Sequence, residues 1–319
     1  MKILHVVPGL EEGGNGIAVA ARLIAAEQGA DLIEARLFAG GDGELDGYGE
    51  VWVHSCWLPM TLKSCRRVLR AGKPLVRMMH GNLDPVRLKY HGWKKWLVGP
   101  IERWCLRRCD RIVATCAAEK EWIEAYLGKK CPVVEVTDVK RFFDLSRVEH
   151  VERVEERGRV DRVERVDRVE KGELHLLYLG RRHPLKGVEY LETAVKGIEG
   201  GELRVVCNAF GAEKERVWDW CDVLVLPTLS ENFGLVVAEA LERGKRVITT
   251  DGAPAWNHEI HEIHEKGTGE FGNHEIHETH EKRVWSGYGG RLVYLKGYRD
   301  GTPEERISLL KAAIENIAK

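Results

Sequence analysis

The chain has 319 residues, of which 44% are hydrophobic and 31% are charged, and its formal net charge at pH 7 is -1. This composition excludes a disordered, collagen-like or disulfide-stapled chain, and it suits one large or two medium globular domains. The balanced charge excludes a bulk attraction of the whole chain to nucleic acid or anionic lipid, so any such attraction must be local.

The eight cysteines are scattered along the chain, and none forms a Cys-x-x-Cys pair. They are expected to be reduced thiols, most of them small buried side chains, rather than a disulfide or zinc framework. No apolar run approaches the roughly 18 residues needed to span a bilayer, and the first apolar run ends early at a Pro-Gly pair. The sequence therefore predicts a cytoplasmic protein without a secretion signal.

The first 145 residues alternate short apolar runs with helical patterns. An apolar run at 2–7, a glycine-rich loop and a helical stretch at 17–28 form the opening unit of a parallel α/β sheet. Further strands are predicted at 51–54, 74–79, 111–114 and 133–136. We expect a Rossmann-like N-terminal domain over residues 1–145.

A three-residue repeat, Arg-Val-Glu or Arg-Val-Asp, occupies residues 147–170. A period of three fits neither a helix nor a strand, so the valines form no constant buried stripe. We expect a linker over 146–172, and a charged coil that binds a partner is the less favoured alternative.

Strand and helix patterns resume after the linker. They predict a second Rossmann-like domain over 173–319, with a cleft between the two domains at the carboxyl ends of both sheets. The strands are expected at 174–179, 203–206, 223–226 and 246–249, and the helices from 188, at 234–243 and at 303–318.

A tandem repeat of Asn-His-Glu-Ile-His-Glu interrupts this second domain at 257–282. Its histidines are spaced His-x-x-His, whereas a zinc-protease helix requires His-Glu-x-x-His. A duplication inserted into a surface loop is therefore the favoured interpretation, with adventitious nickel or zinc binding as the alternative.

The most informative segment is 226–241, which places a strand end, a polar loop and a helix start in succession. Glu231 falls in the loop and Glu239 about one and a half turns into the helix, so both can face one ligand. The N–H groups near Phe233, Gly234 and Leu235, together with the helix dipole, would cradle a phosphate. Taken alone, the segment would favour an ordinary helix with a solvated glutamate and a capping loop.

Four elements in order resemble the family 4 glycosyltransferases of the GT-B fold. They are Gly13-Gly14, His80-Gly81, Gly180-Arg181 with Lys186-Gly187, and the Glu-seven-residues-Glu segment with Pro227-Thr228 and Phe233-Gly234. The segment 80–85, with Trp93-Lys94-Lys95 and Glu102-Arg103, is similar to members that build bacterial surface polysaccharides. The resemblance covers both domains but neither repeat.

The resemblance implies a retaining transfer of a sugar from a nucleotide-diphosphate donor to a saccharide or lipid-linked acceptor, with no cofactor and no required metal. It implies catalytic roles for His80 and Glu231. The donor-binding residues that it implies are Arg181, Lys186, Phe233, Gly234, Leu235, Glu239, Gly14 and Gly16. In this assignment Glu231 contacts the donor sugar and Glu239 the ribose, while the two cations stabilise the departing diphosphate.

Two segments depart from the family pattern. Residues 136–139 read Val-Thr-Asp-Val where the family usually carries Asn-Gly, and the second domain is short between 202 and 218. The shortened part normally helps to hold the nucleotide base, so the pattern does not specify the base.

Basic residues dominate residues 60–111, where tryptophans are interleaved with them. The tryptophans are Trp93, Trp96 and Trp104. This region could dock on an anionic membrane that carries a lipid-linked acceptor, or it could be a solvated basic face. Nucleic acid is not expected as a partner, because no recognised binding module accompanies the basic residues.

Two other functions stay open at this point. One is a catalytically weak GT-B protein that acts as a scaffold in polysaccharide assembly, and the other is a nucleotide-sugar epimerase or phosphorylase on the same fold. Retention of His80, Arg181, Lys186, Glu231 and Glu239 together favours the transferase, because a scaffold does not need the whole set.

Overall fold

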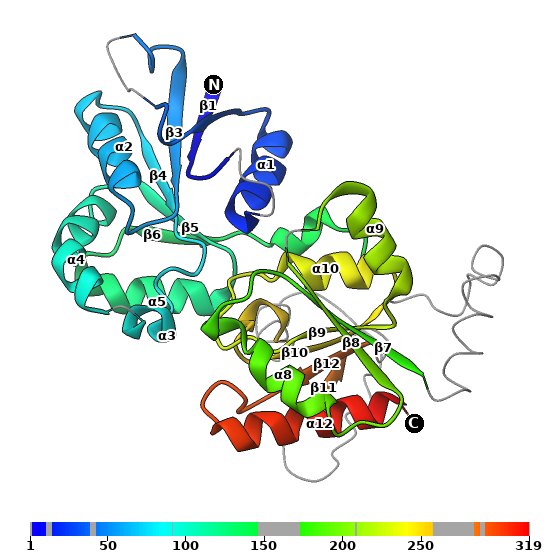
Figure 1. Ribbon diagram of the computed structural model, residues 1–319. Coiled ribbons are helices and arrows are strands. Elements are labelled where there is room, and N and C mark those ends of the chain that lie inside the picture. The colour runs from blue at the N-terminus through cyan, green and yellow to red at the C-terminus, as the bar shows by residue number, and fades with distance from the viewer. Residues whose placement is uncertain are drawn as a thin grey trace, which may run out of the picture. The chain divides into compact units, whose positions relative to one another are not determined.

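The computed structural model describes residues 2–10, 15–38, 43–90, 92–145, 173–207, 209–257, 284–287 and 291–318. The chain divides into two compact units, Met1–Phe142 (unit 1) and Phe143–Lys319 (unit 2), each built on one sheet (Figure 1). The sequence predicts the end of the first domain at residue 145. Gly14, the linker repeat and the His-Glu repeat lie outside the described residues, apart from Asn257 at the start of the latter.

Unit 1 holds a parallel sheet of six strands in the order β2-β1-β3-β4-β5-β6. The strands are β1 (Lys2–Val7), β2 (Asp31–Glu34), β3 (Tyr48–His54), β4 (Leu75–Met78), β5 (Arg111–Ala114) and β6 (Val133–Val136). The helices are α1 (Gly16–Gln28), α2 (Pro59–Arg70), α3 (Pro85–Lys89), α4 (Gly92–Leu106) and α5 (Ala117–Leu127), with short 3₁₀ turns η1 (Gly128–Lys130) and η2 (Val139–Phe142).

Local sequence explains where these elements begin and end. Helix α1 starts after Asn15, whose side chain accepts a hydrogen bond from the Ile17 N–H, and it ends at Gly29 with a left-handed φ of 60°. The central strands are buried on both faces, as expected where helices cover a parallel sheet on both sides. Val51, Val53 and other buried side chains join the helices into one core.

Unit 2 holds a second sheet of six strands in the order β11-β12-β10-β9-β7-β8. The strands are β7 (Leu174–Leu179), β8 (Gly201–Val206), β9 (Val223–Leu226), β10 (Arg246–Thr250), β11 (Val284–Gly287) and β12 (Leu292–Leu295). The helices are α8 (Val188–Val195), α9 (Gly211–Trp220), α10 (Leu235–Glu242) and α12 (Pro303–Ala318), with 3₁₀ turns η3 (Pro184–Lys186) and η4 (Pro254–Trp256).

The predicted fold class is confirmed, since both units are α/β with Rossmann-like sheets. One detail differs from the expectation of parallel sheets: β11 pairs with β12 in the antiparallel sense at the sheet edge. Such an edge strand is common on otherwise parallel sheets. No helix in the described part of the chain has both the length and the apolar character needed to cross a bilayer.

Both sheets share one feature that positions a ligand site. In each, the strand order reverses beside the first strand, between β1 and β3 in unit 1 and between β7 and β9 in unit 2. Loops that leave the carboxyl ends of two such strands diverge to opposite faces, and the crevice between them is where α/β proteins bind ligands.

Candidate functional site

The two loops at the reversal point of unit 2 are held against each other by backbone contacts. The Leu229 N–H donates to the Leu185 carbonyl at 2.9 Å, and the Thr228 hydroxyl donates to the same carbonyl at 3.1 Å. Gly187 has φ of 61°, and a Cβ at this position would lie 2.2 Å from the Pro227 carbonyl oxygen. Glycine at 187 is therefore required both for its φ and for this close approach.

This contact brings together two of the residues that the sequence predicted to act on the donor. The Lys186 ammonium, at the end of η3, forms a salt bridge with the Glu231 carboxylate from the loop after β9. Their side chains are only 14% and 20% exposed. The Glu231 N–H donates to the Gly252 carbonyl at 2.7 Å, which holds the backbone of this loop. Partial burial strengthens the pair relative to an exposed one.

The loop continues directly into α10, as the sequence predicted. Gly234 precedes the helix with φ of 71°, and Leu235 is the first helical residue. Phe233 is buried against Trp256, whose indole N–H donates to the Phe233 carbonyl. The first N–H groups of a helix lack acceptors inside the helix, so this end of α10 can receive an anion.

Glu239 has a partner that the sequence analysis missed. Lys214 in α9 places its ammonium 2.7 and 2.8 Å from the two carboxylate oxygens of Glu239. The shortened segment that the sequence marked as a departure therefore contains a helix that supplies a cation to the site. Helix α9 is mostly polar in sequence, and among its residues only Trp218 is buried.

Arg181 follows β7 and is exposed. Its carbonyl accepts a hydrogen bond from the Tyr178 hydroxyl at 2.8 Å, which orders the loop, whereas its guanidinium has no hydrogen bond or ion pair within the described part of the chain. The neighbouring Arg182 forms a salt bridge with Glu192 of α8 instead. Of the two arginines in this loop, Arg181 is therefore the one whose guanidinium is available to a phosphate.

His80 belongs to unit 1, where it follows β4 at the carboxyl edge of the sheet. It has φ of 54° and is followed by Gly81 with φ of 70°. A left-handed φ costs a non-glycine residue about 1 kcal/mol or more, and such strain concentrates at functional sites. The buried Glu119 of α5 holds this turn by accepting from the Gly81 N–H and from the Thr115 N–H and hydroxyl.

The His80 ring is the end of a line of histidines from neighbouring strands. Nε2 of His80 lies 2.8 Å from Nδ1 of His54, and Nε2 of His54 lies 2.8 Å from Nδ1 of His5. Burial lowers the pKa of His5 to about 4 and that of His80 to about 3, and it lowers the pKa of His54 well below its usual value. All three rings are therefore neutral at pH 7.

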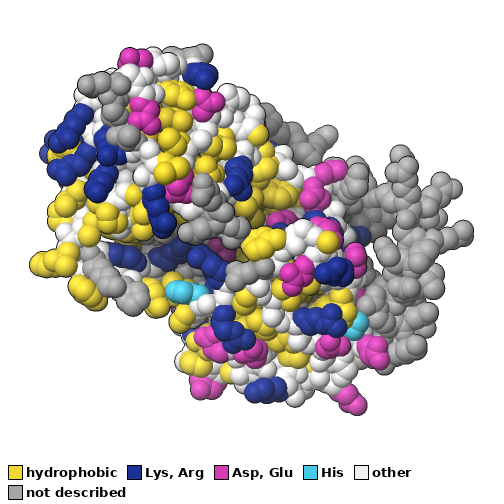
Figure 2. Space-filling model, turned by 45° about the horizontal axis from the view of Figure 1, so that its top comes forward, with side chains coloured by type: hydrophobic (Ala, Val, Ile, Leu, Met, Phe, Trp, Pro, Cys, Tyr) yellow, Lys and Arg dark blue, Asp and Glu magenta, His cyan; other side chains and the backbone are white. Residues whose placement is uncertain are grey.

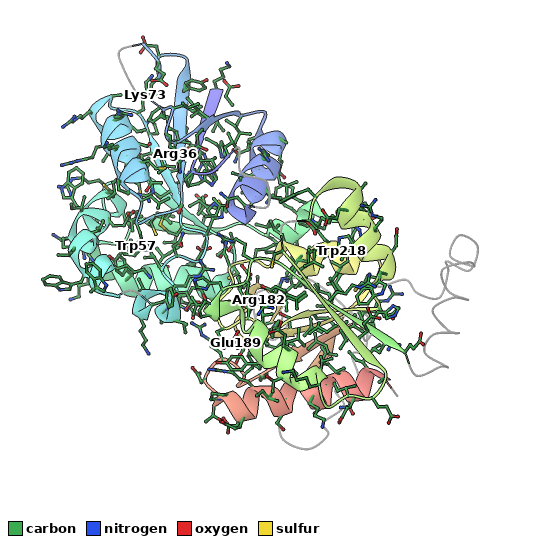
Figure 3. The ribbon with its side chains drawn as sticks, viewed as in Figure 1. Arg36, Trp57, Lys73, Arg182, Glu189 and Trp218 are labelled. Carbon is green, nitrogen blue, oxygen red and sulfur yellow. The ribbon has the colours of Figure 1, made fainter. Side chains whose placement is uncertain are left out.

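A buried ion pair supports the neighbouring loop. The Arg77 guanidinium donates to the Glu102 carboxylate at 2.8 Å and to the Ser55 carbonyl at 2.7 Å, and Glu102 also accepts from the Trp57 N–H at 3.0 Å. Ser55 and Trp57 both have positive φ, 67° and 69°. Trp57 lies beside α4 and α5 (Figure 3) and meets the Tyr126 ring edge to face.

Gly16 is the first residue of α1 and is exposed. Asn15, just before it, ties the preceding loop down by donating from its side-chain amide to the Pro8 and Gly9 carbonyls. The loop expected to approach the ligand is thus anchored at its helix end.

Helix α4 presents a large apolar surface to solvent. Exposed side chains recur on one face at helical spacing: Trp93, Trp96, Leu97, Ile101 and Trp104. In space-filling view, hydrophobic and basic side chains lie side by side at the surface (Figure 2). An exposed apolar stripe of this kind marks an interaction surface.

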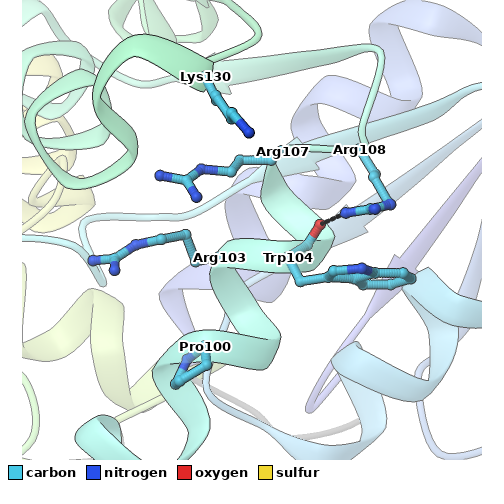
Figure 4. Close-up of a pocket in the computed structure, with 6 residues that line it drawn as sticks. All are labelled: Pro100, Arg103, Trp104, Arg107, Arg108 and Lys130. Atoms are coloured by element: carbon cyan, nitrogen blue, oxygen red, sulfur yellow. Dashed lines mark hydrogen bonds between the residues drawn. The ribbon is translucent and has the colours of Figure 1, made fainter.

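A cavity of about 670 Å³ opens at the carboxyl end of α4 and is lined by cations (Figure 4). Its lining residues are Pro100, Arg103, Trp104, Arg107, Arg108 and Lys130. The Arg108 guanidinium stacks 4.3 Å from the Trp104 ring. In the part of the chain that the structure describes, none of the four cations forms a salt bridge, so the cavity, here called the cationic pocket, suits an anion.

No group of three or more histidine, cysteine, aspartate or glutamate residues among the described ranges is arranged to hold a metal ion. Independence of metal stays a prediction. The assigned roles of the site residues also stay predictions, although the structure brings Lys186, Glu231, Gly234 and Leu235 to one edge of the unit 2 sheet.

Two family matches cover much of the chain. Residues 51–137 match the family described as Glycosyltransferase Family 4, and residues 151–270 match the family described as Glycosyl transferases group 1. A search of curated protein sequences finds no match.

Solved structures resemble this fold at low sequence identity. HepE from Anabaena, in complex with UDP-glucose, is 15% identical with a TM-score of 0.63, over 99% of this chain and 90% of that one. WaaG, a glycosyltransferase involved in lipopolysaccharide biosynthesis, is 10% identical with a TM-score of 0.56, over 99% and 90%. Sucrose-phosphate synthase from Thermosynechococcus elongatus is 16% identical with a TM-score of 0.53, over 78% and 80%.

At these identities the likeness is one of fold. The two matched families follow each other along the chain, and both units have the Rossmann-like architecture. The chain has the two Rossmann-like units of the GT-B fold, and it is similar to two families of glycosyltransferases over residues 51–137 and 151–270.

Proposed function

We propose that the chain moves a sugar from a nucleotide-diphosphate donor to a saccharide or lipid-linked acceptor, with retention at the anomeric carbon and without a required metal, in the synthesis of cell-surface polysaccharide or glycolipid. The observation that carries this proposal is the Lys186–Glu231 pair beside the start of α10, at the reversal point of the unit 2 sheet. A diphosphate and a sugar need this combination of a cation, free N–H groups and a carboxylate.

The proposed division of labour follows from charge. The bond between the anomeric carbon and the diphosphate oxygen breaks and its electron pair leaves with the diphosphate, where Arg181, Lys186 and the α10 N–H groups oppose the new charge. A bond to the acceptor oxygen forms, and the acceptor proton leaves with the nucleoside diphosphate. Glu231 accepts hydrogen bonds from the donor sugar and Glu239 from the ribose, while His80 acts beside the reacting carbon.

The structural neighbours support the donor and pathway classes. HepE was solved with UDP and with UDP-glucose, and WaaG is involved in lipopolysaccharide biosynthesis. We therefore favour a uridine-containing donor. All eight cysteines are free, which supports a reducing, cytoplasmic location.

Replacing Lys186 with Met is expected to lower kcat/KM for sugar transfer by about 10²–10³-fold, because one preorganised charge at the leaving group is lost. The measurement is the rate of nucleoside diphosphate release in the presence of acceptor. Lys196→Met, at an exposed position after α8, is the matched control and is expected to keep the parental rate. An equal rate in Lys186→Met and the parent would contradict the proposed role.

Product analysis in the same assay separates the alternatives. Conversion of the nucleotide sugar to its epimer without acceptor would indicate an epimerase. Nucleotide binding with no turnover for any acceptor would favour the scaffold.

We also propose that residues 60–111 dock on the inner face of the membrane, with the stripe of α4 in the lipid interface and the cationic pocket against anionic headgroups. Tryptophan favours that interface, and each lysine or arginine near an anionic surface adds about 1 kcal/mol.

The double variant Trp93→Ser, Trp96→Ser is expected to bind vesicles of phosphatidylcholine and phosphatidylglycerol at least about tenfold more weakly, because two exposed aromatic side chains lose their lipid contacts. Co-sedimentation measures this. Leu37→Ser, which changes an equally exposed apolar side chain outside α4, is the control and is expected to bind like the parent. Equal binding of the double variant and the control would refute the docking surface and favour a solvated face.

A further inference from the structure

Four side chains of unit 1 form one continuous hydrogen-bonded line. It runs from Gln28, the last residue of α1, through His5 in β1 and His54 at the end of β3 to His80 after β4. The Gln28 amide oxygen lies 2.9 Å from Nε2 of His5, and both histidine-to-histidine distances are 2.8 Å. Each inner ring uses both of its nitrogens, so the line has no branch.

The line is deeply buried and tightly packed. His5 and His54 are fully buried, and His80 is 4% exposed. Trp52 stacks on His5 with ring centroids 4.9 Å apart, and the rings of His54 and His80 stack at 5.1 Å. No carboxylate takes part in the line. Burial, which outweighs the charge of Glu50 near His5, favours the neutral form of all three rings.

When all three rings are neutral, every hydrogen bond in the line donates in the same direction. A neutral imidazole has one N–H donor and one lone-pair acceptor, so the bond at one nitrogen decides the state of the other. In the structure the Gln28 amide turns its oxygen, which can only accept, toward His5, hence Nε2 of His5 donates and its Nδ1 accepts. By the same step Nε2 of His54 donates to His5, and Nε2 of His80 donates to His54.

The line ends at a nitrogen that is available to a ligand. If Nε2 of His80 carries the proton, its Nδ1 holds a lone pair. Nδ1 of His80 has no hydrogen-bond partner within the described residues, although the side chain is almost wholly buried. The left-handed turn at His80 and Gly81, held by Glu119, fixes the direction of the ring.

We propose that Gln28, His5 and His54 are positioning residues that hold His80 in the tautomer with Nε2 protonated, so that Nδ1 presents a hydrogen-bond acceptor to a substrate hydroxyl. The choice of tautomer rests on the line alone. The consequence for turnover also rests on the proposed function, because it assumes that His80 acts in sugar transfer.

The tautomer is read directly from the ¹⁵N chemical shifts of the His80 ring in the full chain, with His80→Asn to assign its signals. The parent is expected to show a protonated Nε2 and an unprotonated Nδ1. Gln28→Glu, which can only accept, is expected to keep this state at a pH high enough to leave His5 neutral beside the new carboxylate. Gln28→Met removes the end acceptor and is expected to give a mixture, because both directions then keep the same internal bonds.

Gln28→Lys places a donor at the end of the line and is expected to reverse it, which protonates Nδ1 of His80. Glu27→Met, on the neighbouring residue that pairs with Arg141, is the matched control and is expected to leave the spectrum unchanged. A parent His80 protonated at Nδ1, or the same tautomer in the parent, Gln28→Met and Gln28→Lys, would overturn the proposal.

Turnover then separates the line from the proposed function. Gln28→Lys is expected to lower kcat at least about tenfold at unchanged KM for the donor, and Gln28→Glu to retain the parental kcat, since the role of the line is to set a proton position. If the tautomer reverses in Gln28→Lys and kcat stays the same, the result supports the proposal about the tautomer and contradicts the role of His80 in sugar transfer.

Discussion

Replacing Glu102 with Gln is expected to lower the free energy of unfolding by about 3–5 kcal/mol. The Arg77 and Glu102 side chains are fully buried, so the variant leaves a guanidinium inside unit 1 without a counter-charge. The two Glu102 oxygens accept from Arg77 and from the Trp57 N–H. An amide has only one oxygen, so in the variant the NH₂ group faces either Arg77 or the Trp57 N–H, and one of these two hydrogen bonds is lost. Urea unfolding followed by tryptophan fluorescence measures the change.

Glu135→Gln is the matched control, because it removes one partner of an exposed pair with Arg111 in the same unit. Its expected cost is at most about 1 kcal/mol. Equal effects of the two variants would contradict the role given to the buried pair. The loss in Glu102→Gln is also expected to loosen the turn at Ser55 and Trp57, whose positive φ values the pair supports.

Unit 1 is expected to lose stability steeply as the pH falls below about 6.5, the ordinary pKa of histidine. The pKa values of His5, His54 and His80 are lowered in the folded state, to about 4 for His5 and about 3 for His80. The unfolded chain therefore binds more protons below about pH 6.5, and stability that is complete above that pH is lost as the pH approaches the folded values. Each histidine contributes up to about 1.4 kcal/mol per pH unit.

The three rings together give a slope of up to about 4 kcal/mol per pH unit near pH 5. Burial raises the pKa of Glu119, which acts in the opposite sense toward lower pH, so the measurement is made between about pH 5 and 7. His54→Asn is expected to reduce the slope by about a third, whatever its effect on absolute stability. The same slope in His54→Asn and in the parent would contradict neutral burial of this ring.

The architecture of both units was predictable because the buried strands are short apolar runs between helical patterns. The strands at 111–114, 133–136, 174–179 and 223–226 have the predicted bounds. β2 and α9 were missed because both carry few buried apolar residues. β2 has four residues at the edge of its sheet, and α9 is a largely exposed helix. Tertiary position, rather than local pattern, determines such elements.

The donor site was predictable where its residues lie in one segment and not where they come from separate elements. Glu231, Gly234 and Glu239 share a loop and a helix start, so one stretch of sequence carries them, and its resemblance to a family pattern predicts a site there. Lys214 reaches Glu239 from a helix that the sequence did not show. His5 and His54 are single histidines on strands far apart in sequence, and only the order β1-β3-β4 makes them neighbours of His80.

The most direct test of the central claim, that unit 2 binds a nucleotide-diphosphate sugar, is a calorimetric and thermal-shift panel of UDP, GDP, ADP and their common sugars. A ligand that binds only the folded state at about 100 times its Kd stabilises it by about 2.7 kcal/mol. The expected result is selective binding of one nucleotide, kept in Lys196→Ala and lost in Lys186→Ala and Glu239→Ala. Binding of no nucleotide, or equal binding by all of these variants, would contradict the claim.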